Sequence, residues 1–137
     1  MTGPEIVTKV QQLRWPEGSY VVFGSCPMAL AGIREAQDID FLVSPELFQR
    51  LIEEGWAERD KGPTDKPRVY EDFEAHQNWG FSHYAPTLTQ LLSTATVVNN
   101  VAFASLEEVR KWKASGNRPK DKADVKLIDS YLKKTSV

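Results

Sequence analysis

The sequence predicts an α+β fold in which a mixed β-sheet carries helices packed mainly on one face. Two kinds of segment support this fold class. Short apolar runs such as Tyr20–Phe23 and Asp38–Val43 are typical of strands, whereas Ser44–Gly55 repeats its apolar residues at helical spacing. The 137 residues predict a single domain over the whole chain, since this length buries a sizeable core without disulfide or metal staples.

The remaining elements follow from periodicity and from capping residues. Pro4–Leu13 has the spacing of a short amphipathic helix, and Ser44 followed by Pro45 is typical of a helix start. The pair Asn99-Asn100 predicts a tight hairpin between two apolar strands, because asparagine tolerates a positive φ. The chain order also predicts helices at Pro27–Ala31 and Thr87–Ala95, and two more helices after Ser105.

Composition narrows the class of protein. Hydrophobic residues make up 41% and charged residues 26%, which is usual for a soluble globular protein. The net charge of −2 and the absence of basic runs argue against a general nucleic-acid binder. The single cysteine, Cys26, excludes an internal disulfide and has no base beside it, so a buried or incidental thiol is expected. The N-terminus lacks a signal peptide and no apolar run reaches membrane-spanning length, which predicts a cytoplasmic protein without a membrane partner.

The segment Tyr20–Val43 carries the residues with the clearest chemistry. It is predicted to form a strand, a Gly24-Ser25 turn, a short helix and a second strand. Side chains alternate along a strand, so Asp38 and Asp40 point to the same face. Two adjacent carboxylates repel each other, and Mg²⁺ offsets that repulsion because it prefers oxygen ligands. The backbone N–H groups of the glycine turn favour phosphate, so the segment predicts a site for Mg²⁺ and a phosphorylated ligand.

This pattern resembles the signature of the nucleotidyltransferase superfamily, which has the DNA polymerase beta-like fold. The likeness is strongest to small prokaryotic members, the minimal nucleotidyltransferases and the AbiEii-type toxins. It rests on Gly24-Ser25, Gly32, Arg34 and Asp38-Ile39-Asp40. The resemblance implies a nucleotidyltransferase-like fold and Mg²⁺-dependent transfer of a nucleoside monophosphate from an NTP, with ATP favoured, to a hydroxyl acceptor.

The resemblance also implies roles for these residues. Asp38 and Asp40 would bind the metal, and Gly24 and Ser25 would cradle the phosphates of the nucleotide. Arg34 would contact a phosphate, although an ion pair with Glu35 or with the aspartates is an equal alternative.

A third carboxylate is implied on the strand next to the two aspartates. The segment Arg68–Ala75 is interpreted as one continuous strand, in which Asp72 and Glu74 share the polar face. Asp72 is the favoured catalytic and metal-binding residue, and Glu71 is the alternative because the family's third acid often lies between apolar neighbours. Glu74 is not excluded by this reasoning.

The next two segments are predicted to be loops. Asp60–Pro67 is rich in turn-forming residues and predicts a surface loop. His76–Pro86 is rich in aromatic residues, and packing of its rings against the sheet is favoured over a platform for a nucleobase. A zinc site with His76 and His83 is not expected, because no cysteine pair accompanies them.

The last two predicted helices carry charged residues on their inner faces. Lys113 recurs with the apolar residues of the first helix, and Asp121 and Asp124 lie one turn apart on the second. In a structural interpretation, Lys113 or Arg118 pairs with one of these aspartates. The family resemblance implies instead that Lys113 and Lys120-Asp121 serve the nucleotide site, and both interpretations stay open.

The main functional hypothesis is therefore an enzyme, a nucleotidyltransferase. The resemblance adds a role in a toxin–antitoxin or defence system, with a toxin or antitoxin as the protein partner. The alternative is a catalytically inactive module of the same fold that binds a nucleotide or a partner protein. A nucleic-acid partner is not expected, except for tRNA as an acceptor. A homodimer could complete the pocket, since the short chain lacks a separate substrate domain.

Overall fold

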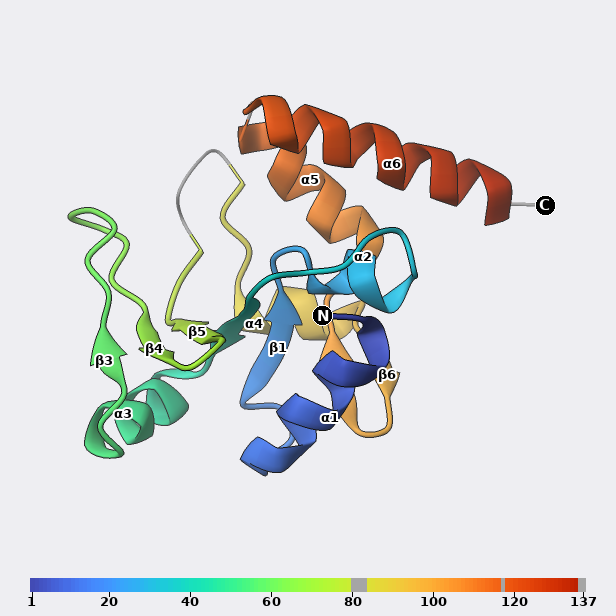
Figure 1. Cartoon of the computed structure of the whole chain (residues 1–137). Helices are drawn as coiled ribbons and strands as arrows, with labels where there is room; N and C mark the ends of the chain where they lie inside the picture. Colours follow the sequence, from blue (N-terminus) through green and yellow to red (C-terminus); the bar gives the residue numbers. More distant parts are fainter. Residues whose placement is uncertain (80–83, 117, 136–137) are drawn as a thin grey trace.

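The structure is a computed structural model that describes residues 1–79, 84–116 and 118–135. Seven strands form one mixed sheet in the order β3-β4-β5-β2-β1-β7-β6 (Figure 1). The strands are β1 (Tyr20–Phe23), β2 (Ile39–Val43), β3 (Ala57–Glu58), β4 (Arg68–Tyr70), β5 (Phe73–His76), β6 (Thr96–Val98) and β7 (Val101–Phe103). The helices in the described part are α1 (Gly3–Leu13), α2 (Cys26–Leu30), α3 (Pro45–Glu53), α4 (Leu88–Ser93), α5 (Leu106–Gly116) and α6 (Pro119–Thr135).

The three central strands set the register of the functional residues. Strand β2 runs antiparallel to β1 and parallel to β5. Phe23 at the end of β1 lies opposite Asp40 of β2, and Asp40 in turn lies opposite Glu74 of β5. Because residues opposite each other on neighbouring strands point to the same face, Asp40 and Glu74 project from the sheet side by side.

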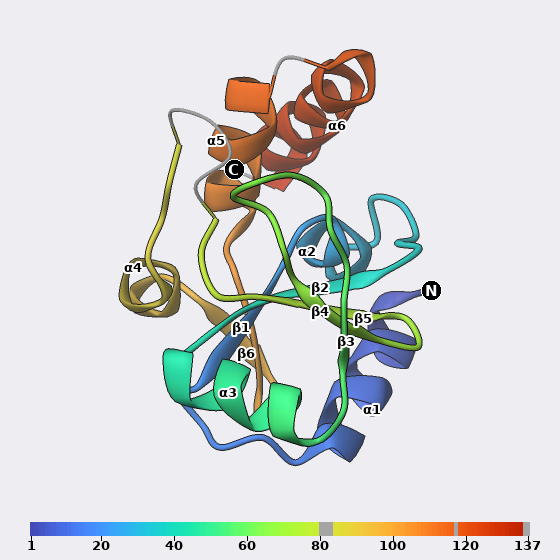
Figure 2. The ribbon, with the colours of Figure 1, turned by 90° about the vertical axis from the view of Figure 1, so that its left-hand side faces the viewer.

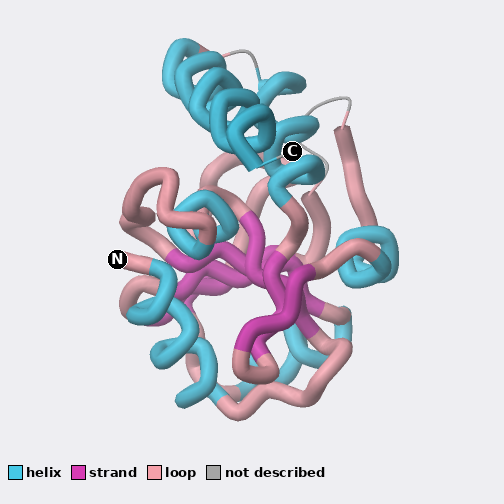
Figure 3. Tube along the Cα trace, turned by 90° about the vertical axis from the view of Figure 1, so that its right-hand side faces the viewer, coloured by secondary structure: helices cyan, strands magenta, loops and turns pink. Residues whose placement is uncertain are grey.

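The sheet has an apolar face and a cavity face. Helices α1 and α3 pack on the apolar face, which the strands build from Tyr20, Val22, Ile39, Phe41, Val43, Phe73, Ala75, Val101 and Phe103. Helices α4, α5 and α6 pack on the cavity face, which the strands build from Val21, Phe23, Asp40, Leu42, Glu74 and His76. Figure 3 shows helices on both sides of the strands.

The expectation that helices pack mainly on one face is therefore wrong. All four residues of β1 are buried, so both faces of this central strand are covered. Val21 and Phe23 would be exposed to water if α4, α5 and α6 were absent from their side. The α+β class and the mixed sheet are confirmed.

Several local predictions are confirmed with their physical reasons. The Ser44 side chain accepts a hydrogen bond from the Leu47 N–H and so caps α3. The Thr87 side chain caps α4 by accepting the N–H of Gln90. The hairpin between β6 and β7 turns at Asn99-Asn100, which have φ values of 48° and 69°.

The expectation of one strand over Arg68–Ala75 is wrong. Strands β4 and β5 are antiparallel and separated by a turn at Glu71-Asp72, so that Tyr70 pairs with Phe73. Glu71 has φ 51°, a left-handed value that glutamate rarely adopts. No glycine or asparagine marks this turn, which explains why the sequence pattern misses it.

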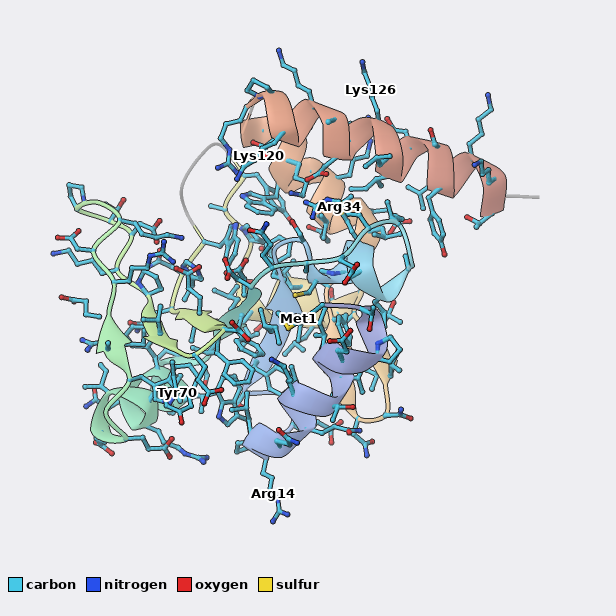
Figure 4. All side chains as sticks on the ribbon, in the orientation of Figure 1. Met1, Arg14, Arg34, Tyr70, Lys120 and Lys126 are labelled. Carbon is cyan, nitrogen blue, oxygen red and sulfur yellow. The ribbon has the colours of Figure 1, made fainter. Side chains whose placement is uncertain are left out.

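Helix α6 is the longest element and lies across α5 (Figure 1). It buries Asp121, Asp124 and Ile128 and leaves Leu127 exposed. Lys126 points away from the body of the molecule (Figure 4). Within the three described ranges, no helix is long and apolar enough to cross a membrane.

Candidate functional site

A cavity of about 680 Å³ lies on the cavity face of the sheet. Its floor comes from β2 and β5, one wall from the loop between β3 and β4, and the opposite wall from α5 and α6. Figure 2 shows that loop rising from the sheet on the same side as α5 and α6. The charged residues that line the cavity include Arg34, Asp38, Asp40, Lys61, Glu74, Lys113, Arg118, Lys120 and Asp124.

Two carboxylates and a histidine meet on the floor of the cavity. One ligand atom from each of Asp40, Glu74 and His76 can be chosen so that all three lie within 4.8 Å of one another. Glu74 and His76 are both buried, at 5% and 4% exposure. Asp38 lies immediately before β2, is exposed, and lines the same cavity. The floor therefore gathers a donor set that fits one divalent cation.

Glycine is required beside these carboxylates. A Cβ atom at Gly24 would lie 2.3 Å from Oδ2 of Asp40, and the backbone at Gly24 has φ +63°. Any side chain here would displace the Asp40 carboxylate and strain the turn. The Gly24-Ser25 turn thus lies directly against the carboxylate of Asp40.

The two neighbouring carboxylates affect each other's ionisation. Burial raises the pKa of Asp40 well above its usual value, and the hydrogen bond and negative charge of Glu74 raise it further. Burial alone would raise the pKa of Glu74, but its contacts with His76, Asp40 and Lys61 outweigh that cost and lower it. The pair therefore favours one proton or one cation between them over two uncompensated charges.

Positive groups of the β3–β4 loop lie over Glu74. The Nζ atom of Lys61 is 3.0 Å from Oε1 of Glu74, and Nη1 of Arg59 is 3.5 Å from the same oxygen. From the same loop, Oδ1 of Asp65 lies 3.5 Å from Nδ1 of His76. The segment expected to be a plain surface loop thus supplies charged groups to the cavity.

A second polar cluster links the Gly24-Ser25 turn to the last two helices. Arg34 donates two hydrogen bonds to Asp124, at 2.9 and 2.8 Å, and a third to Oγ of Ser25 at 3.0 Å. Lys113 Nζ lies 2.8 Å from Oδ2 of Asp124 and donates to the same Ser25 hydroxyl at 3.2 Å. Figure 4 shows Arg34 below α6. The hydroxyl of Ser25 is consequently held by two cations.

This cluster shifts the ionisation of its members. Burial lowers the pKa of Lys113, although its contact with Asp124 acts in the opposite direction. Burial would raise the pKa of Asp124, but hydrogen bonds from Arg34 and Lys113 outweigh it and lower the pKa. Asp124 therefore stays ionised between two positive groups.

Helix α6 begins with a second ion pair. Asp121 is almost fully buried and accepts hydrogen bonds from Nε of Arg118 at 2.8 Å and from its Nη2 at 3.1 Å. Lys120 is exposed and lines the cavity, and Figure 4 places it near the start of α6. The structural interpretation of the inner charges is confirmed, since Lys113 pairs with Asp124 and Arg118 pairs with Asp121. A role in nucleotide binding stays a prediction.

The structure brings most of the predicted site residues to one place. Asp38, Asp40, Ser25, Arg34, Lys113 and Lys120 line the cavity, and Gly24 touches Asp40. Asp121 does not line the cavity, but its partner Arg118 does.

Asp72 is the exception among the predicted site residues. It lies in the turn between β4 and β5, is exposed, and pairs with Lys9 of α1 at 3.0 Å. Because Glu71-Asp72 forms that turn, the acid beside Asp40 on the next strand is Glu74. Sequence reasoning also missed His76 and Lys61 as cavity residues. The spacing of Glu74 and His76, two residues apart in one strand, is the signal that could have found the pair.

The aromatic segment after β5 is described only in part. Trp79 is buried and packs against Phe23, with ring centroids 4.7 Å apart, and against Trp112 at 5.3 Å. For Trp79, packing against the sheet is thus confirmed. His83 lies outside the described residues, so the expectation about a zinc site stays a prediction.

Comparison with known proteins adds no family to this geometry. No protein-family model, no curated protein and no solved structure matches the chain. The likeness to nucleotidyltransferases therefore remains a hypothesis about residues 24–40 and the last two helices. The residues that line the cavity are therefore the basis for proposing a function.

Proposed function

We propose that this protein is a nucleotidyltransferase that transfers a nucleoside monophosphate from an NTP, with ATP favoured, to a hydroxyl group. The observation that carries the proposal is the pairing of Asp40 with Glu74 across neighbouring strands, against the glycine of the Gly24-Ser25 turn. The cavity contains both carboxylates and cationic side chains. This combination fits a metal-bound triphosphate, because the carboxylates can bind the metal and the cationic side chains can bind the phosphates.

The acidic side of the cavity would hold the divalent cation. Glu74 supplies buried oxygen ligands, the partly buried Asp40 lies beside it, and Asp38 adds an exposed carboxylate. The bound cation would neutralise charge on the phosphate that is attacked. Asp38, which is exposed, can accept the proton of the incoming hydroxyl group. The hydroxyl oxygen bonds to the α-phosphate, the bond between the α- and β-phosphates breaks, and pyrophosphate leaves.

The basic side of the cavity would hold the phosphates. Ser25 is oriented by Arg34 and Lys113, so its hydroxyl group can turn its proton toward a phosphate oxygen. Arg118 and Lys120 are exposed on the cavity wall and carry long side chains that can reach an anion. Lys113 lies 4.7 Å from the centroid of the Trp112 ring, which also lines the cavity and offers an apolar surface to a base.

A nucleotide-binding module without transfer activity is the second candidate. It is favoured by the pairing of both Arg34 and Lys113 with Asp124, because cations that are already paired gain less from a phosphate. The two candidates differ in turnover and not in nucleotide binding.

Calorimetry with ATP, with and without Mg²⁺ or Mn²⁺, tests the proposal. We expect ATP to bind only with a divalent cation, and Asp40→Asn to weaken this binding by about 100-fold, the loss of a charged metal ligand. Asp72→Asn is the matched control, since it removes an aspartate that pairs with Lys9 outside the cavity. Equal ATP affinity with and without cation would contradict the metal-dependent enzyme, and no ATP binding under either condition would contradict both candidates. Incubation with ATP labelled on the α-phosphate then separates them, because only the enzyme leaves label on an acceptor.

A further inference from the structure

A histidine, His76, lies beside the two carboxylates, and a cation site made of oxygen ligands alone gives this residue no role. His76 is the last residue of β5, and its side chain is 5% exposed. It follows Glu74 by two residues and therefore projects from the same face of the sheet. Its Nε2 atom is 3.8 Å from Oε2 of Glu74. The position of the ring is thus fixed by the strand, next to the proposed cation site.

The neighbours of His76 orient its two nitrogens. Oδ1 of Asp65 faces Nδ1 at 3.5 Å, and the ring of Trp79 packs edge-on with centroids 4.6 Å apart. These contacts hold the ring with Nε2 on the side of Glu74, so this nitrogen can turn toward a cation that the carboxylates bind. Asp65 lies near the other ring nitrogen, where carboxylates commonly support metal-binding histidines.

The second carboxylate oxygen of Glu74 also points to a ligand. The Glu74 side chain is 7% exposed, and its buried Oε1 atom makes no hydrogen bond. The charges of Lys61 at 3.0 Å and of Arg59 at 3.5 Å lie close to this oxygen. A positive group therefore already lies where a cation would bind this oxygen.

We propose that Asp40, Glu74 and His76 form a single mixed nitrogen–oxygen site for a transition-metal dication such as Mn²⁺, with Nε2 of His76 as a ligand. Imidazole nitrogen suits first-row transition metals, whereas Mg²⁺ takes oxygen ligands almost exclusively. Ligands of one ion lie up to about 4.4 Å apart when metal–ligand bonds are about 2.2 Å. Only one pair among three ligands can lie opposite each other across an ion, so the three ligand atoms, which lie within 4.8 Å of one another, draw closer together when the ion binds. The inference rests on the proposed function, because it identifies the cation of that same site.

The test compares Mn²⁺ and Mg²⁺ binding to the full chain without nucleotide, by calorimetry. His76→Asn removes Nε2 but keeps an amide N–H near Asp65, so the support is retained. We expect this variant to weaken Mn²⁺ binding by about 10- to 100-fold and to change Mg²⁺ binding by less than about 3-fold. In wild-type protein loaded with Mn²⁺, pulsed electron paramagnetic resonance should show coupling to a directly bound nitrogen, and His76→Asn should abolish it.

Two further variants keep the test decisive. His76→Gln places an amide oxygen near the position of Nε2, so nitrogen coupling should vanish while Mg²⁺ binding persists, even if His76→Asn does not fold. Lys61→Met removes a competing positive charge, and Mn²⁺ should then bind about 2- to 5-fold more tightly, the range for one partly exposed ion pair.

The outcomes separate the inference from the proposed function. If Mn²⁺ binds wild type without nitrogen coupling and folded His76→Asn keeps full Mn²⁺ affinity, the nitrogen–oxygen site is overturned, and cation-dependent ATP binding can still hold. If neither Mn²⁺ nor Mg²⁺ binds the wild type, with or without ATP, both ideas fail. Loss of nitrogen coupling together with weaker Mn²⁺ binding supports the inference.

Discussion

The two faces of the sheet use the same strands in opposite ways. On the apolar face, Phe41 is fully buried and its ring lies 4.7 Å from that of Trp15 and 5.9 Å from that of Phe73. On the cavity face, the preceding residue Asp40 and its neighbour Glu74 are carboxylates. Two consecutive residues of β2 thus point to opposite faces, one into close apolar packing and the other toward a cluster of charged groups.

From this difference we expect the apolar face to stabilise the fold and the cavity face to bind the proposed ligand. Aromatic packing stabilises a sheet through buried area, whereas adjacent buried carboxylates destabilise it unless a cation or a proton is present. We therefore expect substitutions on the apolar face to act on stability alone. Substitutions on the cavity face should separate stability from ligand binding.

The largest effect is expected on the apolar face. Phe41→Ala removes a ring that contacts Trp15, Tyr20 and Phe73, and should lower the free energy of unfolding by about 3–5 kcal/mol. Urea unfolding measures this loss. Val97→Ala is the control, since Val97 is 63% exposed and should change the value by less than about 0.5 kcal/mol. Similar losses for both variants would contradict the division between the faces.

The next largest effect concerns the buried ion pairs above the cavity. Asp124→Ala leaves Lys113 buried without its partner, and should lower the free energy of unfolding by about 3 kcal/mol. This is the lower end of the usual range because Arg34, the other partner, is 37% exposed and can be solvated. Asp129→Ala removes an exposed pair with Arg110 and should have little effect. A loss for Asp124→Ala no larger than that for Asp129→Ala would contradict the expectation.

The same aspartate should give the protein a pH dependence. Because the folded pKa of Asp124 is lowered, the folded state holds its proton less tightly than the unfolded state. Its contribution to stability is therefore complete above the unfolded pKa and is lost as the pH falls through the folded pKa. Urea midpoints of wild type and Asp124→Asn should converge as the pH is lowered below about 4, the ordinary value for aspartate. Parallel curves would exclude this source.

A smaller effect of opposite sign is expected at the carboxylate pair. Without added cation, Asp40→Asn removes one of two adjacent acids, of which Glu74 is buried and Asp40 partly buried, and should raise the free energy of unfolding by about 1 kcal/mol. Urea unfolding in a chelator measures this gain. With Mn²⁺ present, the order should reverse, because only the wild type binds the cation. A loss of stability in the chelator would show that the pair supports the fold.

The smallest effect is expected for the reactivity of Cys26, which lies just after the end of β1. Cys26 is fully buried, and burial, aided by the charge of Asp40, raises the pKa of its thiol to about 12. We expect no reaction with a thiol reagent at pH 8 while the protein is folded. Val97→Cys supplies an exposed thiol in the same chain and should react at once. Fast reaction of Cys26 in the wild type would mean that the end of β1 opens readily.

Much of this division could be predicted from the sequence, because it depends on local patterns. The alternation of Asp40 with apolar neighbours placed it opposite to Phe41, and the cap at Ser44 marked the start of α3. The buried charges on α5 and α6 were also visible, since Lys113 recurs with apolar residues at helical spacing.

The errors came from features that local patterns do not encode. Glu71 adopts a positive φ because the neighbouring strands fix the hairpin, and nothing in its side chain signals this. The sequence pattern therefore favours Asp72 as the carboxylate beside Asp40, whereas in the structure Glu74 lies opposite Asp40 and Asp72 pairs with Lys9. The sequence does indicate that both faces of the sheet are covered. Val21 and Phe23 are as apolar as Tyr20 and Val22, and a strand that is apolar at every position is typically buried on both faces.

The order of elements along the chain has a consequence for biosynthesis. All seven strands are complete by Phe103, whereas Lys113 and Asp124 belong to helices that follow. Strands can therefore pair while the ribosome is still translating the rest, since segments made first can fold first. The hydroxyl of Ser25 acquires both of its fixed neighbours only after residue 113 has emerged, and the pocket closes only when α6 docks. A nascent polypeptide would thus have an assembled sheet before the cavity is complete.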